Sequence, residues 1–169
     1  MKNKTQKIVI SALFASLVCV TTMLVQIPSP LKGYLNLGDA IVLLSAWLLP
    51  PVYGAVAAGL GSALSDLFSG YALYAPATFL IKGAMALIAH ALAARLAKKH
   101  KLLTSRLCGG ITAELIMILG YYLFESLLYG FGASLVNIPA NALQGSVGLI
   151  LGILLIALFE KQGIHNTLK

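Results

Sequence analysis

The fold of this chain is decided between residues 76 and 97, which read PATFLIKGAMALIAHALAARLA. At a rise of about 1.5 Å per residue, a helix of this length crosses the roughly 30 Å hydrocarbon core of a membrane. Pro76 suits the first turn, where its missing N–H would have no partner. Lys82 interrupts the apolar run, and a cation at membrane depth usually faces a bundle interior or a polar cavity. The stretch therefore predicts a spanning helix whose Lys82 side chain points into the bundle, either to serve a function or to form an ion pair.

The composition of the whole chain indicates the same class. The 169 residues are 59% hydrophobic and only 10% charged, with a mean hydropathy of +0.91, whereas soluble domains carry about 25% charged residues. We expect an all-α integral membrane protein that forms a single membrane domain over residues 1–169 and crosses the membrane six times. The second helix is short because Pro50 and Pro51 end it, and residues 130–137 are expected to form a loop. The expected helices are 7–26, 38–49, 52–69, 76–97, 105–129 and 138–159.

The net charge of +7 could suggest nucleic-acid binding, but the distribution of the basic residues favours membrane topology. They gather at the N-terminus (Lys2, Lys4, Lys7), around one loop (Arg95, Lys98, Lys99, Lys101, Arg106) and at the C-terminus (Lys161, Lys169). Six crossings would put these three groups on one side, with only Lys32 on the other. By the positive-inside rule, both termini are expected in the cytoplasm, and no nucleic-acid partner is expected.

Motifs for enzyme chemistry are absent from the sequence. It contains no GxxxxGK[ST], HExxH or GxSxG pattern, which are signatures of nucleotide binding, zinc proteolysis and serine hydrolysis. Cys19 and Cys108 form neither a CxxC motif nor a Cys/His cluster, so metal ligation is not expected. We therefore expect a protein that is not an enzyme and that needs no cofactor or metal.

Polar side chains recur within the apolar segments at one expected depth. Lys82 should lie about 9 Å below the outer end of its helix, with Asp66 near the outer end of the preceding helix. Glu114 and Glu125 stand eleven residues apart, about three helical turns, so they share a face with Tyr121 between them. A further stripe at i, i+4 and i+7 consists of Asn137, Asn141 and Gln144. Together these stripes predict a water-accessible cavity in the outer half of the bundle.

Aromatic and amide side chains from the loops should complete this cavity. The turn after the third helix supplies Tyr71 and Tyr74, and the first loop supplies Tyr34, Asn36 and Asp39. Tyrosine rings stack on flat rings, and amides pair with the donors and acceptors on a ring edge, so the lining suits a small polar heterocycle. Other interpretations stay open. Lys82 could form only a buried ion pair with Asp66 or a glutamate, the amides could join helices, the tyrosines could belong to an interfacial belt, and Asp39 could cap the second helix.

Small residues line two neighbouring ridges of the first helix. Ser11, Ala15 and Cys19 form one ridge, and Ala12 and Ser16 form the other. Such small-xxx-small ridges allow close approach between membrane helices. They could serve packing within the bundle or contact with another protein.

Several segments resemble those of a known family in order and content. The run from residue 33 to 88, GYLNLGDAIVLLSAWLLPPVYGAVAAGLGSALSDLFSGYALYAPATFLIKGAMALI, is followed by AELIMILGYYLFE and NIPANALQGSVG. This order resembles a substrate-binding S component of an energy-coupling factor (ECF) vitamin transporter, within the branch assigned to pyridoxine or hydroxymethylpyrimidine uptake. The resemblance covers essentially the whole chain.

The resemblance implies a function and partners. A six-helix bundle in the prokaryotic plasma membrane would capture a vitamin from outside and work with a transmembrane coupling protein (EcfT-type) and two cytoplasmic ATPases. It also implies that residues 27–38 act as a lid, with Tyr34 and Asp39, and that Ser11, Ala12, Ala15 and Ser16 include the docking ridge. The expected substrate-binding residues are Asn36, Asp66, Tyr74, Lys82, Glu114, Tyr121, Glu125, Asn141 and Gln144. Two alternatives are a solitary carrier in which Glu114 carries a proton, and a membrane scaffold in which the charges only fix helix register.

Overall fold

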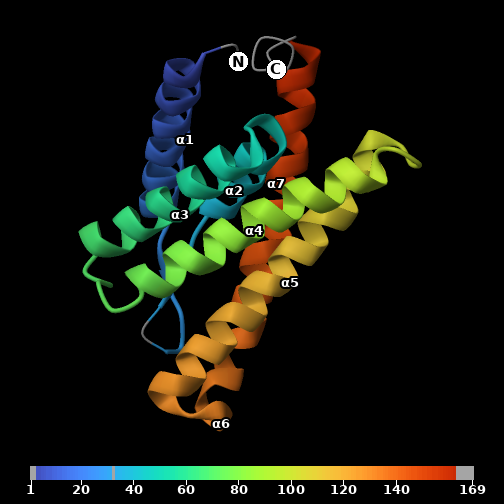
Figure 1. Ribbon diagram of the computed structural model, residues 1–169. Coiled ribbons are helices and arrows are strands. Elements are labelled where there is room, and N and C mark those ends of the chain that lie inside the picture. Colours follow the sequence, from blue (N-terminus) through green and yellow to red (C-terminus); the bar gives the residue numbers. More distant parts are fainter. Residues whose placement is uncertain (1–2, 32, 163–169) are drawn as a thin grey trace.

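The computed structural model describes residues 3–31 and 33–162, and within them the chain is almost entirely helical (Figure 1). The long helices are α1 (Lys4–Leu24), α2 (Gly38–Leu48), α3 (Pro51–Phe68), α4 (Ala75–Leu96), α5 (Leu102–Tyr129) and α7 (Ile138–Lys161). A small antiparallel hairpin of β1 (Ile27–Pro28) and β2 (Tyr34–Leu35) follows α1. The all-α membrane class is confirmed, with six main helices in the described ranges. Three of the basic residues used in the topology argument, Lys2, Lys32 and Lys169, lie outside the described residues.

Not all six helices are long enough to cross a membrane. By length and hydropathy, the spans are α1, α4, α5 and the continuous helical segment Phe131–Lys161. The helix α2 is apolar but has only 11 residues, which cover about 17 Å, as the double proline after it predicts. Outward-facing positions of the spans are apolar, for example Leu80 at 69% exposure and Leu127 at 84%. Such side chains suit contact with lipid tails.

The segment 130–137 differs from the expected loop. Gly130 ends α5 with a φ of +90°, a conformation that glycine adopts without steric cost. The chain then winds into the short helix α6 (Phe131–Ser134) and a 3-10 turn (Leu135–Asn137) that leads directly into α7. The expectation of a loop was wrong because a single glycine breaks the helix here without preventing the next turn from forming.

Small residues bring the helices close together inside the bundle. A Cβ on Gly61 of α3 would overlap the Ala15 carbonyl of α1, and one on Gly148 of α7 would lie 2.6 Å from the Asp39 Cβ of α2. Helices α3 and α4 pack against each other, as do α4 and α5, and α2 lies against α7. These glycines of α3 and α7 therefore serve packing within the chain.

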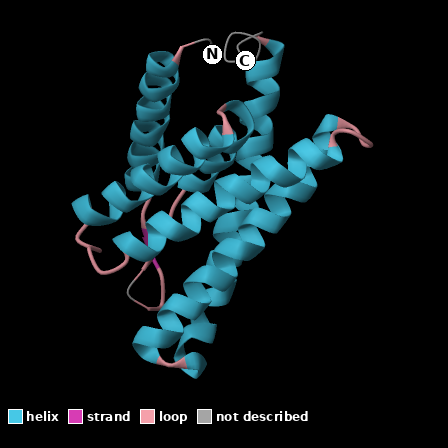
Figure 2. Cartoon of the chain, in the orientation of Figure 1, coloured by secondary structure: helices cyan, strands magenta, loops and turns pink. Residues whose placement is uncertain are grey.

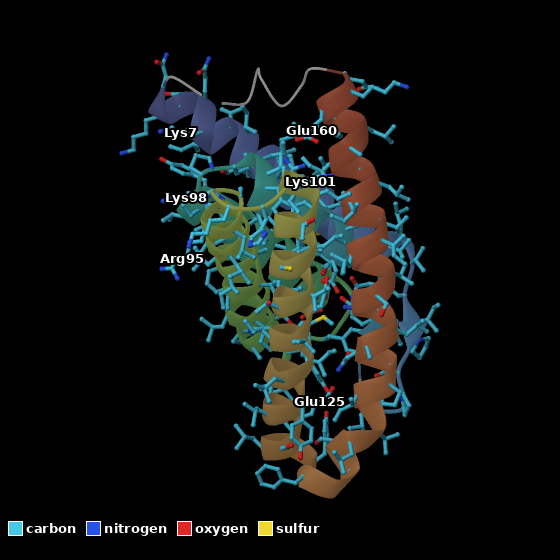
Figure 3. All side chains as sticks on the ribbon, turned by 90° about the vertical axis from the view of Figure 1, so that its right-hand side faces the viewer. Lys7, Arg95, Lys98, Lys101, Glu125 and Glu160 are labelled. Carbon is cyan, nitrogen blue, oxygen red and sulfur yellow. The ribbon has the colours of Figure 1, made fainter. Side chains whose placement is uncertain are left out.

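The two ends of the bundle differ in character. In Figures 1 and 2, the β1–β2 hairpin lies at the end opposite the start of α1. Figure 3 places Glu125 toward that same end, away from Lys7 and Glu160. Basic side chains thus lie toward the end where α1 begins and α7 finishes, whereas the hairpin and Glu125 occupy the other end.

Candidate functional site

A polar hollow lies between the β1–β2 hairpin and the ends of α3, α4, α5 and α7. It encloses about 420 Å³ of space, including the part open to solvent. The hairpin and its flanks form one wall, and the helices form the others. The lining residues are Ser29, Gly33, Tyr34, Asn36, Asp66, Tyr71, Tyr74, Thr78, Tyr121, Glu125, Asn137, Asn141 and Gln144.

Most of the side chains expected from the sequence meet in this hollow. It is lined by Asn36, Asp66, Tyr74, Tyr121, Glu125, Asn141 and Gln144, together with Tyr34 from the expected lid. Lys82 and Glu114 do not line it. The lining also includes Asn137, from the predicted polar stripe, and Tyr71, from the predicted aromatic turn. Three lining residues were not expected there: Ser29, Gly33 and Thr78. Ser29 and Gly33 depend on the hairpin, in which Ser29 N–H donates to the Gly33 carbonyl at 2.9 Å.

Lys82 forms an ion pair with a residue other than the expected ones. Its ammonium forms an ion pair with the Asp39 carboxylate, and it also lies 3.2 Å from the Met117 sulfur. Asp39 is fully buried in the first turn of α2. The expectation that Asp39 belongs to the lid was therefore wrong, as was pairing of Lys82 with Asp66 or a glutamate. Spacing along single helices could not reveal this pair because it joins α2 and α4.

Gln144 connects this buried pair to the hairpin side of the hollow. Its Nε2 donates to Asp39 Oδ2 at 2.7 Å, while its Oε1 accepts from the backbone N–H of Asn36 at 3.0 Å and from Asn36 Nδ2 at 3.2 Å. Both ends of the amide are therefore used. The side chain fastens the segment after β2 to α7 and to the ion pair beneath it.

The hairpin makes two further contacts across the hollow. The Tyr34 hydroxyl donates to Asp66 Oδ1 at 2.7 Å, and the Leu31 N–H donates to Asn137 Oδ1 at 3.3 Å. Burial and the Asp66 carboxylate raise the pKa of the Tyr34 hydroxyl above its ordinary value, so Tyr34 stays protonated and acts as a donor. Together with Gln144, these contacts tie the hairpin to α3, to the turn before α7 and to α7 itself.

Aromatic rings form the side of the hollow next to the α3–α4 turn. The ring centroids of Tyr34 and Tyr71 are 4.8 Å apart, and those of Tyr71 and Tyr74 are 6.5 Å apart. The Tyr121 hydroxyl donates to Thr78 Oγ1 at 3.1 Å. The rings offer faces for stacking against a flat ligand.

Glu114 lies deeper in the bundle than the hollow. It is 6% exposed, and neither carboxylate oxygen has a hydrogen-bond partner within the described residues. A Cβ added to Gly145 of α7 would lie 2.9 Å from Glu114 Oε2, so the glycine makes room for this carboxyl group. Glu114 is therefore not among the residues that line the hollow.

The small residues of α1 fall on two faces. Ser11 is buried and Ala15 is half-buried toward α3, whereas Ala12 and Ser16 are exposed. Ser11, Ala12 and Ala15 also line an apolar groove of about 600 Å³ between α1 and α3. Of the two ridges considered, the one with Ala12 and Ser16 is the accessible one.

Comparisons with known proteins agree with this architecture. Residues 2–161 match the family model described as "ECF-type riboflavin transporter, S component". An uncharacterized protein of Pyrococcus woesei is 38% identical over 136 residues, which are 80% of this chain and 88% of that protein. The thiamine precursor transporter HmpT of Lactococcus lactis subsp. cremoris is 27% identical over 172 positions, which cover 100% of this chain and 97% of HmpT.

A solved structure of the S component of a bacterial ECF transporter has the same fold. It superposes with a TM-score of 0.76 and 24% sequence identity, covering 94% of this chain and 98% of the other.

Proposed function

The chain belongs to the S components of ECF-type transporters, and from that premise we propose that it captures a single-ring vitamin precursor of the hydroxymethylpyrimidine or pyridoxine type. Members of this family are transport proteins and not enzymes. The observation that carries the proposal is the hollow under the hairpin, where tyrosine rings and buried polar side chains from five helical segments converge. The similarity to HmpT over the full chain supports a pyrimidine.

The charge distribution supports a hollow that opens outward. The N-terminal region and the α4–α5 region contain Lys4, Lys7, Arg95, Lys98, Lys99, Lys101 and Arg106. In Figure 3, Lys7, Lys98 and Lys101 lie toward the end away from Glu125, and Arg95 lies nearer mid-height. The positive-inside rule assigns that basic end to the cytoplasm. Both termini would then be cytoplasmic, and the hairpin would act as an external lid.

Mass spectrometry of small molecules retained by the purified protein tests the proposed function. We expect a substituted pyrimidine or pyridine to be released on denaturation and to be depleted when cells grow without it. Recovery of riboflavin, or of no heterocycle after growth with each candidate supplied in excess, would contradict the proposal.

Uptake would require the coupling module that the family implies, a transmembrane coupling protein with two cytoplasmic ATPases. We propose that Ala12 and Ser16 form the docking ridge, because they are the exposed small residues of α1 and Ala12 borders the groove against α3. A partner helix can approach closely only where side chains are small. Ser11 and Ala15 are instead assigned to packing against α3.

Replacing Ala12 with tryptophan is expected to abolish copurification with the coupling protein and to leave ligand binding unchanged, because the indole would fill the groove far from the hollow. The measurement is pull-down of the coupling protein combined with a ligand titration. Leu80→Trp is the matched control, since Leu80 is 69% exposed on α4, and it should assemble normally. Normal assembly of the Ala12 variant would show that another surface docks.

A further inference from the structure

The free polar groups of the hollow are mainly acceptors, and we infer that its ligand is a donor-rich heterocycle that bears an amino group and carries no phosphate or carboxylate. The inference rests on the proposed function, because it concerns the ligand of the same hollow. It adds what the fold and the family do not specify, namely the charge and hydrogen-bonding character that this chain selects.

Two buried carboxylates each present one free oxygen. Asp66 is 5% exposed and Glu125 is 3% exposed, and both line the hollow. One oxygen of each is held by a neutral donor: Asp66 Oδ1 accepts from the Tyr34 hydroxyl, and Glu125 Oε1 accepts from Asn137 Nδ2, both at 2.7 Å. The other oxygens, Asp66 Oδ2 and Glu125 Oε2, are buried without a hydrogen-bond partner in residues 3–31 and 33–162. An unpaired buried carboxylate oxygen is costly, so a ligand that donates to it gains affinity.

Most donors and acceptors of the lining amides are already used in hydrogen bonds within the protein. Asn137 uses its Nδ2 on Glu125 and its Oδ1 on the Leu31 N–H, and Gln144 uses both ends of its amide. Asn36 donates to Gln144 and accepts from the Gly38 N–H at 2.9 Å. Asn141 is the lining amide that has no internal hydrogen bond among the described residues. It is therefore the amide that could either donate to a ligand ring or accept from it.

The residues that line the hollow include no cation. The charge of Lys82 acts on Asp66, but the Lys82 ammonium is paired with Asp39 outside the lining. The uncharged hydroxyls of Thr78 and Tyr74 lie near Asp66 and Glu125, but not in the geometry of a hydrogen bond to the two free oxygens. An anionic ligand would therefore meet like charge in a buried setting, which disfavours its charged form. An amino group or a protonated ring nitrogen supplies both the missing donor and a favourable charge.

Isothermal titration of the purified full-length protein with three matched probes tests the inference. The probes are 4-amino-5-hydroxymethyl-2-methylpyrimidine, its 4-oxo analogue, which places an acceptor where the amine donates, and its phosphate ester. We expect the amino compound to bind tightest and the other two to bind about 10- to 100-fold more weakly. Equal or tighter binding of the oxo analogue or the ester overturns the inference alone. Failure of all three probes and of pyridoxine to bind overturns the proposed function.

The variant Glu125→Gln tests the assignment to a residue. The Asn137 amide still needs an acceptor, so the new side chain keeps its oxygen there and turns its Nε2 donor into the hollow. We expect the ratio of affinities between the amino probe and the phosphate ester to fall by about tenfold or more. An unchanged ratio would overturn the inference.

Two further variants complete this design. Asp66→Asn applies the same logic through the Tyr34 donor, and it serves if the Glu125 variant does not fold. Glu160→Gln is the matched acid-to-amide control, because Glu160 pairs with Arg106 at the opposite end of the bundle from Glu125 (Figure 3). It should leave the affinity ratio as it is in the unmodified protein. If both lining variants also keep that ratio, these carboxylates do not select the ligand.

Discussion

Replacing Lys82 with methionine is expected to lower the free energy of unfolding by about 3–5 kcal/mol, the usual cost of removing one partner from a buried ion pair. Lys82 is 3% exposed and Asp39 is fully buried, so the substitution leaves the Asp39 carboxylate with no cation. The Gln144 amide at 2.7 Å would be its remaining polar partner among those described. Thermal unfolding of the detergent-solubilised protein, followed by the near-ultraviolet signal of Trp47, measures the loss.

Two comparisons make this result specific. The double variant Lys82→Met with Asp39→Asn is expected to regain most of the stability, because the amide oxygen of asparagine still accepts from Gln144 and no charge is buried. Glu160→Gln changes the partly exposed partner of Arg106 and should cost less than Lys82→Met, because the amide oxygen of glutamine can still accept from the Arg106 guanidinium. If Lys82→Met costs as little as Glu160→Gln, the pair does not stabilise the bundle in the way described here. If the double variant also loses ligand binding, Lys82 or Asp39 contacts the ligand after all.

Replacing Gln144 with methionine is expected to weaken ligand binding about 10- to 100-fold, mainly through faster dissociation. Methionine has a similar length but cannot accept from Asn36 or donate to Asp39. The segment after β2 would lose its attachment to α7, and the hairpin would open more often. Hydrogen exchange of residues 27–37, measured together with the ligand dissociation rate, reports both effects.

Ser146→Ala is the control for the Gln144 variant. Ser146 lies on the exposed face of the same helix and donates only to the Ala142 carbonyl, so its removal should change neither rate. Unchanged exchange of the hairpin in Gln144→Met would mean that the amide bridge does not hold the hairpin closed.

The sequence was sufficient to predict the membrane class, the helix positions and most of the hollow. Apolar runs and prolines fix the helices, and the periodic spacing of Tyr121, Glu125, Asn141 and Gln144 places these side chains on inward faces. All four line the hollow. Spacing succeeds here because each helix is long and its polar residues are few.

The partners of the buried charges could not be predicted, because they depend on how helices pack. Asp39 lies where a loop meets the start of a short helix, which made a lid or a cap the natural interpretation. Only the contact between α2 and α7 at Gly148, together with the crossing of α4, brings Asp39 to both Lys82 and Gln144. The same limit applies to Ser29 and Gly33, since no periodic pattern reports the register of a two-residue hairpin.

Cysteine labelling at Ser29 tests most directly whether ligand binds in the hollow under an external hairpin. Ser29 would be replaced by cysteine after Cys19 and Cys108, the two native cysteines, are changed to serine. In right-side-out vesicles, a membrane-impermeant maleimide should label this position, and saturating hydroxymethylpyrimidine should slow the labelling strongly. Labelling only after the membrane is permeabilised, or at a rate that the bound ligand does not change, would contradict the account.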